Sequence, residues 1–190
     1  MIASTSESAP GLNLYFRDYL FENVYLRTTE CQRAEILTLW HNGKAGIEGA
    51  DAERSSREAV FLIRNRSGQL VGASTVALVR LKDGQRYYSF SLFLRPQDRV
   101  PYLMVTVCDA TRDFLHNFKH PVSQPAGMLN INENRKLMRP GMRRLFERHG
   151  YRYWGQTMSG EDVWVTEFAE TGRVGLNTSP DQPIAPAKEG

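Results

Sequence analysis

The chain has 190 residues, of which 41% are hydrophobic and 24% are charged, and its formal net charge at pH 7 is +3. This length fits one domain of ordinary size and leaves little room for a second. No apolar run approaches the roughly 20 residues that cross a bilayer, and the polar first residues lack the apolar core of a signal peptide. We therefore expect a cytoplasmic protein without a membrane segment, or one built into an assembly that forms in the cytoplasm.

The two ends of the chain differ in composition from the middle. Residues 1–12 and 171–190 are rich in Ser, Pro and Gly, and bury too little apolar surface to offset the entropy of an ordered chain. We expect both to be flexible tails on a single domain that spans residues 13–170. A partner protein, or further copies of the chain, would be needed to order them.

The cysteines and histidines give no indication of a metal site. Cys31 and Cys108 are isolated from one another, and each falls in an expected helix with apolar neighbours. This setting favours buried free thiols over a disulfide. The four histidines show no ligand spacing, so we expect no zinc centre.

The first third of the chain predicts a strand followed by helices. Residues 21–26 are apolar and aromatic enough to form the first strand. Thr29 followed three residues later by Gln32 is a capping box, which predicts a helix through Asn42 that Gly43 terminates. A second, short helix is expected over residues 52–59.

The middle of the chain predicts a meander of strands and one long helix. Residues 59–64 and 69–79 read as a hairpin, and the alternating aromatics of residues 87–94 form a third strand. After a polar turn, Pro101 suits the first position of a helix that continues to Phe118 with one apolar stripe.

The last third completes an α+β pattern. Residues 127–131 form a compact strand, residues 140–149 a helix capped by Gly150, and two further strands, 151–158 and 163–168, form a hairpin. The whole predicts a mixed, mostly antiparallel central sheet of about six to seven strands, flanked by about four helices.

The turn between residues 94 and 102 is a candidate anion site. A strand here leads directly into a helix N-terminus, where unpaired N–H groups and the helix dipole favour negative charge. Arg95 and Arg99 lie in this turn and suit phosphate groups.

Two segments carry a resemblance to a known family. The hairpin of residues 61–72 is similar to the second and third strands of the GNAT acyltransferase superfamily. The block Leu145-Phe146-Glu147-Arg148-His149-Gly150-Tyr151 resembles the family's Leu-Tyr-Glu-Lys-x-Gly-Phe signature. The order of elements over about residues 22–168 is also that of a GNAT-like fold.

The resemblance implies that acetyl-CoA or another acyl-CoA binds between the family's fourth and fifth strands. Its pyrophosphate would be held by a loop of pattern Gln/Arg-x-x-Gly-x-Gly/Ala. Aligning Arg99 with the first position places Tyr102 and Met104 at the glycines, and Pro101 removes one N–H. The residues assigned to acyl-CoA binding are Leu94, Arg95, Arg99, Tyr102, Leu103 and Asn134.

The catalytic groups of the family are also altered. Phe146 occupies the position where many members carry a tyrosine that protonates the departing thiolate, and a phenyl ring donates no proton. The strand of residues 87–94 carries no Glu, Asp or His to deprotonate an amine. Glu133 and Glu161 are the candidate substitutes.

Two functions from different classes remain open. One is an N-acyltransferase that moves an acyl group from acyl-CoA to an amine of unknown identity. The other is a catalytically silent GNAT-like structural or assembly protein, for example a virion component, that uses its tails and the basic segment 135–152 to bind partner chains. Binding to nucleic acid is disfavoured because no groove-reading motif is present.

Overall fold

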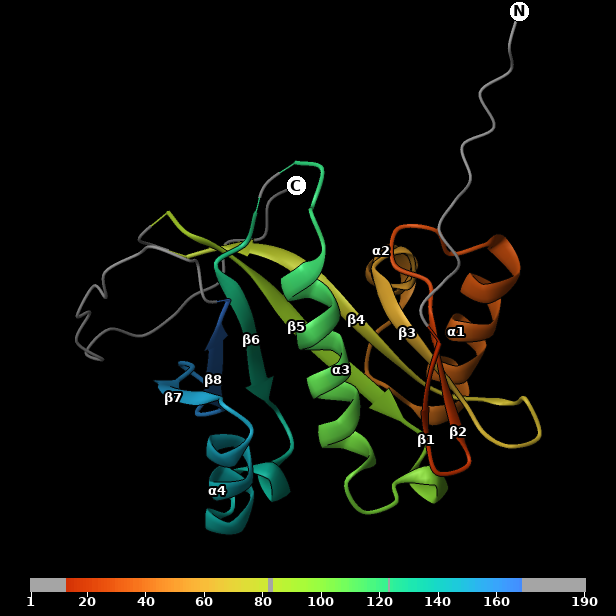
Figure 1. Ribbon diagram of the computed structural model, residues 1–190. Helices are drawn as coiled ribbons and strands as arrows, with labels where there is room; N and C mark the ends of the chain where they lie inside the picture. Colours follow the sequence, from red (N-terminus) through yellow and green to blue (C-terminus); the bar gives the residue numbers. More distant parts are fainter. Residues whose placement is uncertain (1–12, 82–83, 123, 169–190) are drawn as a thin grey trace, which may run out of the picture.

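The computed structural model describes residues 13–81, 84–122 and 124–168. The expected flexible tails, 1–12 and 171–190, lie outside the described residues. The described part of the chain is built around one sheet with helices on both faces (Figure 1). The expected α+β class is therefore confirmed.

The described residues contain eight strands in the order β1-β2-β3-β4-β5-β6-β8-β7. Only the central β5–β6 pair is parallel, and every other pair is antiparallel. The strands are β1 (Asn13–Phe16), β2 (Tyr19–Asn23), β3 (Ala59–Arg64), β4 (Leu70–Arg80), β5 (Arg86–Leu94), β6 (Gly127–Asn132), β7 (Arg152–Gln156) and β8 (Asp162–Glu167).

The described residues also form four α-helices and two short 3₁₀ helices. Helices α1 and α2 pack over β3 and β4 on one face, while α3 and α4 pack on the other (Figure 1). The helices are α1 (Glu30–Gly43), α2 (Gly49–Arg57), α3 (Leu103–Asn117) and α4 (Pro140–Arg148), with 3₁₀ helices η1 (Pro96–Asp98) and η2 (Arg135–Met138).

The N-terminal edge of the sheet differs from the sequence expectation. The predicted first strand, 21–26, is found earlier as β2, and Arg17 turns the chain back so that β1 pairs with it. Arg17 adopts a positive φ of 53°, a conformation that is uncommon for a residue other than glycine and that no local pattern predicts. This additional hairpin explains why the sheet has more strands than the six to seven predicted.

Helix α1 shows one confirmed and one wrong prediction. Thr29 and Gln32 form the expected capping box, with each side chain bonded to the other's backbone amide. The left-handed C-cap, however, is Lys44 at φ 51°, and Gly43 still belongs to the helix. A Cβ on Gly43 would lie 2.2 Å from Cζ of Phe93, so this glycine lets α1 approach β5 closely.

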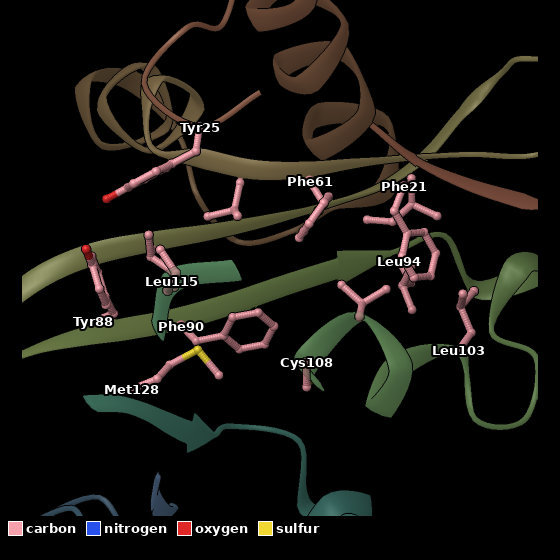
Figure 2. Packing of buried hydrophobic residues seen from close by; sticks show 14 of the residues in the cluster. Phe21, Tyr25, Phe61, Tyr88, Phe90, Leu94, Leu103, Cys108, Leu115 and Met128 are labelled. Atoms are coloured by element: carbon pink, nitrogen blue, oxygen red, sulfur yellow. The ribbon is translucent and has the colours of Figure 1, made fainter. Parts of the chain in front are cut away.

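The main core lies between the sheet and α3. Figure 2 shows Phe61, Tyr88 and Phe90 from the sheet with Leu103 and Cys108 from α3. Burying a side chain of this size contributes about 1.5 to 3 kcal/mol to the free energy of unfolding. A second cluster, which includes Ile36, Trp40 and Leu62, lies under α1 and α2.

The two cysteines have different environments. Cys108 is buried in the main core, as predicted, but Cys31 is exposed. The prediction for Cys31 was wrong because this residue lies in the first turn of α1, on a side that faces away from the sheet. Both thiols are free.

Candidate functional site

Strands β5 and β6 separate after three paired positions. The last of them joins Phe90 to Asn130, whereas β5 continues to Leu94 while pairing only with β4. Ser91, the next residue of β5, is exposed although the strand lies in the middle of the sheet. Backbone groups on this side of β5 therefore have no neighbouring strand, and an extended ligand can bond to them.

Helix α3 begins at the open end of this separation. Its N-cap is Tyr102, whose side chain makes no capping hydrogen bond, and the first helical residue is Leu103. The prediction that Pro101 occupies the first helical position was wrong, because Tyr102 first turns the chain through a left-handed conformation at φ 69°. The Leu103 amide donates to the Val100 carbonyl at 3.3 Å, so the N–H groups of the first turn that follow it are the ones available to an anion.

Tyr102, which aligns with the first glycine of the family's loop pattern, has a backbone conformation typical of glycine. Positive φ is the conformation that glycine adopts without a steric cost. The side chain of Tyr102 is 63% exposed, and Met104 packs against the main core. Of the two bulky residues at the glycine positions, Tyr102 is thus directed to solvent and Met104 to the core.

The two arginines of the turn have different roles. Nε of Arg95 bonds to Oδ2 of Asp98 at 2.7 Å, which stabilises the turn around η1. Nε of Arg99 donates to the carbonyl of Leu94 at 3.0 Å, and its side chain is exposed and makes no ion pair within the described residues. Arg99 is therefore the one with charge free for a ligand.

Two buried asparagines face the same side of β6. Asn130 and Asn132 are only 4% and 5% exposed. Oδ1 of Asn130 and Nδ2 of Asn132 have no hydrogen-bond partner among the described residues. Buried polar atoms are normally paired, so these two are ready to bond to a polar ligand. Sequence reasoning missed Asn130; polar residues alternating with apolar ones on a buried strand were the available signal.

Phe146 belongs to an aromatic cluster that includes Trp164, the register partner of Asn130. It is 2% exposed, stacks on Trp164 at a centroid distance of 5.3 Å, and meets Tyr151 edge-on at 5.7 Å. Burial raises the pKa of Tyr151, and its hydroxyl has no partner among the described residues. Phe146 itself supplies packing and no proton.

The structure brings Glu133 and Glu161 together. Asn132 and Asp162 are the last register pair of β6 and β8, and the two glutamates are the next residues beyond that pair. Both line one pocket of about 480 Å³. A hydrogen bond from the Thr157 hydroxyl lowers the pKa of Glu161 below its usual value and keeps it ionised.

Asn134 lies beside this pocket and has a structural role. Its side-chain oxygen accepts a hydrogen bond from the Lys136 amide at 3.0 Å and caps η2. The assignment of Asn134 to acyl-CoA binding stays a prediction. Leu94 and Leu103, also assigned to that role, are buried. The Leu94 carbonyl accepts from Arg99 and the Leu103 amide donates to the Val100 carbonyl, so their assignment stays a prediction.

Within the described ranges there is no group of three or more side chains that could hold a metal ion. None of the helices there has the length and apolar character of a membrane span.

Comparison with solved structures identifies the architecture. A GNAT-family acetyltransferase from Listeria monocytogenes superposes with a TM-score of 0.59 at 12% identity, covering 82% of this chain and 99% of its own. The chain has the GNAT fold. A ribosomal-protein-S5-alanine acetyltransferase from Vibrio fischeri gives a TM-score of 0.54 at 10% identity, covering 82% of this chain and 94% of its own. No family model and no curated sequence matches.

A third GNAT neighbour was solved with a ligand. The NatB acetyltransferase complex, bound to CoA and MES, superposes with a TM-score of 0.51 at 14% identity, covering 72% of this chain and 95% of its own. Residues 61–72, which resemble the family's second and third strands, lie in β3 and β4, so β5 and β6 correspond to its fourth and fifth strands. The strand separation therefore lies where the sequence resemblance expected it.

Proposed function

We propose that the protein is an N-acyltransferase that transfers an acyl group from acyl-CoA to an amine. The observation that carries the proposal is the separation of β5 from β6 at the uncapped N-terminus of α3. This arrangement offers an elongated donor two kinds of contact. The open edge of β5 suits amide groups, and the helix N-terminus suits phosphates.

The residues around the opening fit such a donor. The orphan atoms of Asn130 and Asn132 supply one acceptor and one donor for the amides of a pantetheine arm. Arg99 supplies a positive charge for the phosphates beside the N–H groups that follow Tyr102.

Acyl-CoA would supply an activated acyl group as a thioester: as the amine nitrogen bonds to its carbonyl carbon, the carbon–sulfur bond breaks. The protein's own part is to hold the amine and take its proton. Glu133 follows three residues after Asn130, the last residue of β6 that pairs with β5, and it shares a pocket with Glu161. These two carboxylates can accept the proton. With Phe146 at the tyrosine position, the thiolate takes its proton from solvent.

Titration of acetyl-CoA into the full chain tests this proposal. A ligand that binds only the native state raises the melting temperature in a saturating manner. We expect such a rise, and we expect CoA thiol to be released when a mixture of primary amines is added. Absence of any rise at millimolar acetyl-CoA would exclude the acyltransferase.

One observation favours a second candidate, a catalytically silent GNAT-fold protein that binds partner chains. Phe146 removes the family's proton donor, while exposed arginines on and before α4 are free to meet an acidic partner. Such a protein would form complexes or cytoplasmic assemblies without binding acetyl-CoA. The same titration separates the two candidates.

A further inference from the structure

The pocket beside Glu133 and Glu161 contains charges of both signs. Its walls come from the end of β6, from η2 and from the turn between β7 and β8. The residues that line it are Glu133, Arg135, Met138, Arg139, Ser159, Gly160 and Glu161. Its volume of about 480 Å³ suits a small molecule and is too small for a folded protein.

These charges do not neutralise one another. Within the described part of the chain, none of Glu133, Arg135, Arg139 and Glu161 takes part in an ion pair. Here both signs remain available to a ligand that carries both.

The pocket walls are held in place by neighbouring contacts. The Asn134 cap fixes the start of η2, and Thr157 bonds to both the carboxylate and the amide of Glu161. Arg143 of α4 bonds twice to Asp162, at 2.7 and 2.8 Å, and so fixes α4 against β8. The opposing charges are therefore presented from positions that the fold fixes.

We propose that this pocket binds an α-amino acid as the acyl acceptor, which rests on the proposed acyltransferase function. The ammonium group lies between Glu133 and Glu161, at the end of β6 that has separated from β5. The carboxylate meets Arg135 and Arg139, and Met138 contacts the side chain. Phosphate-bearing acceptors are disfavoured because two carboxylates line the same pocket.

The test uses the full chain and the twenty L-amino acids, added singly at millimolar concentration while melting temperature and heat of binding are recorded. At least one is expected to bind. Its amide, which lacks the carboxylate, and its N-acetyl derivative, which lacks the ammonium, are each expected to bind about tenfold or more weakly. Equal binding of the amide, or no binding by any amino acid, would overturn the proposal.

Two variants connect the result to the pocket. Arg139→Gln is expected to weaken binding of the free amino acid about tenfold and to leave binding of its amide unchanged. Arg144→Gln, on the exposed side of α4, is the matched control and should change neither. Acetyl-CoA binding is measured in parallel. If acetyl-CoA binds and no amino acid does, only this inference is refuted. If an amino acid binds and acetyl-CoA does not, the proposed acyltransferase function is refuted.

Discussion

Arg143 donates two hydrogen bonds to Asp162, whose carboxylate is completely buried between α4 and β8. A carboxylate in that position needs a partner, because burial penalises its charge. The Gln156 amide adds one further bond, at 3.2 Å. This pair joins α4, the helix that carries Phe146, to the hairpin of β7 and β8.

Arg143→Gln is therefore expected to destabilise the fold. Removing one partner of a fully buried pair costs about 3 to 5 kcal/mol, and we expect roughly 2 to 3 here because Arg143 is 40% exposed. Urea denaturation measures the loss. Arg144→Gln is the neighbouring control and should change stability by less than about 0.5 kcal/mol; equal effects of the two would contradict the assigned role of the pair.

Tyr102 gives a second prediction, because it holds a left-handed conformation at φ 69°. Tyr102→Gly relieves a conformation that costs a non-glycine residue about 1 to 2 kcal/mol. Tyr102→Ala keeps the Cβ and serves as the control. The Tyr102→Gly variant should be more stable than the Tyr102→Ala variant by about 1 kcal/mol in thermal unfolding. It should also bind acetyl-CoA at least as tightly as the natural chain. A stability equal to that of alanine would show that the left-handed backbone is not strained.

The sequence predicted most of the elements because they are marked by local signals. The capping box at Thr29, the alternating aromatics of β5 and the glycine after α4 each depend on residues close in the chain. The additional β1–β2 hairpin was missed since it depends on a positive φ at Arg17. No composition rule requires this conformation of an arginine.

The candidate site was only partly predictable for a related reason. Glu133 and Glu161 were selected for their chemistry, and the register of β6 against β8 brings them together. Asn130 was not selected, because only the tertiary packing shows that its oxygen is buried without a partner. Local patterns locate elements, whereas pairing across the sheet decides which polar groups face a ligand.

The C-terminus of α1 provides a third prediction from two adjacent residues. Lys44→Gly places glycine at the left-handed position, φ 51°, and should stabilise the protein by about 1 kcal/mol. Gly43→Ala adds a Cβ only 2.2 Å from the Phe93 ring and should cost about 1 to 3 kcal/mol. Chemical denaturation of the two variants measures both changes in stability. If both variants were stabilised, or both destabilised, Lys44 would not be the left-handed C-cap of α1.

The ionisation of Glu161 gives a pH prediction. The Thr157 hydroxyl lowers the pKa of this carboxyl, so the folded protein keeps it charged at lower pH than the unfolded chain does. Its stabilising contribution is present above the ordinary value of 4.5 and is lost as the pH falls through the lower folded pKa. Carboxyl NMR titration should show the pKa rising in Thr157→Val and unchanged in Thr157→Ser. An unchanged pKa in the valine variant would exclude this hydrogen bond as the cause.

The last prediction concerns the unpaired oxygen of Asn130. A buried polar atom without a partner costs about 1 to 3 kcal/mol, and an apolar side chain of similar shape avoids that cost. Asn130→Leu should therefore leave the ligand-free protein as stable as before, or more stable by up to about 1 kcal/mol.

The same substitution should weaken acetyl-CoA binding if the oxygen faces the donor. Loss of one such hydrogen bond corresponds to about a tenfold change in affinity. Thermal unfolding and calorimetric titration of one preparation measure both effects. Thr166→Val, at a buried polar position on the neighbouring strand β8, is the control and should keep the affinity. A destabilised Asn130→Leu that binds acetyl-CoA normally would show that Asn130 serves the fold and not the ligand.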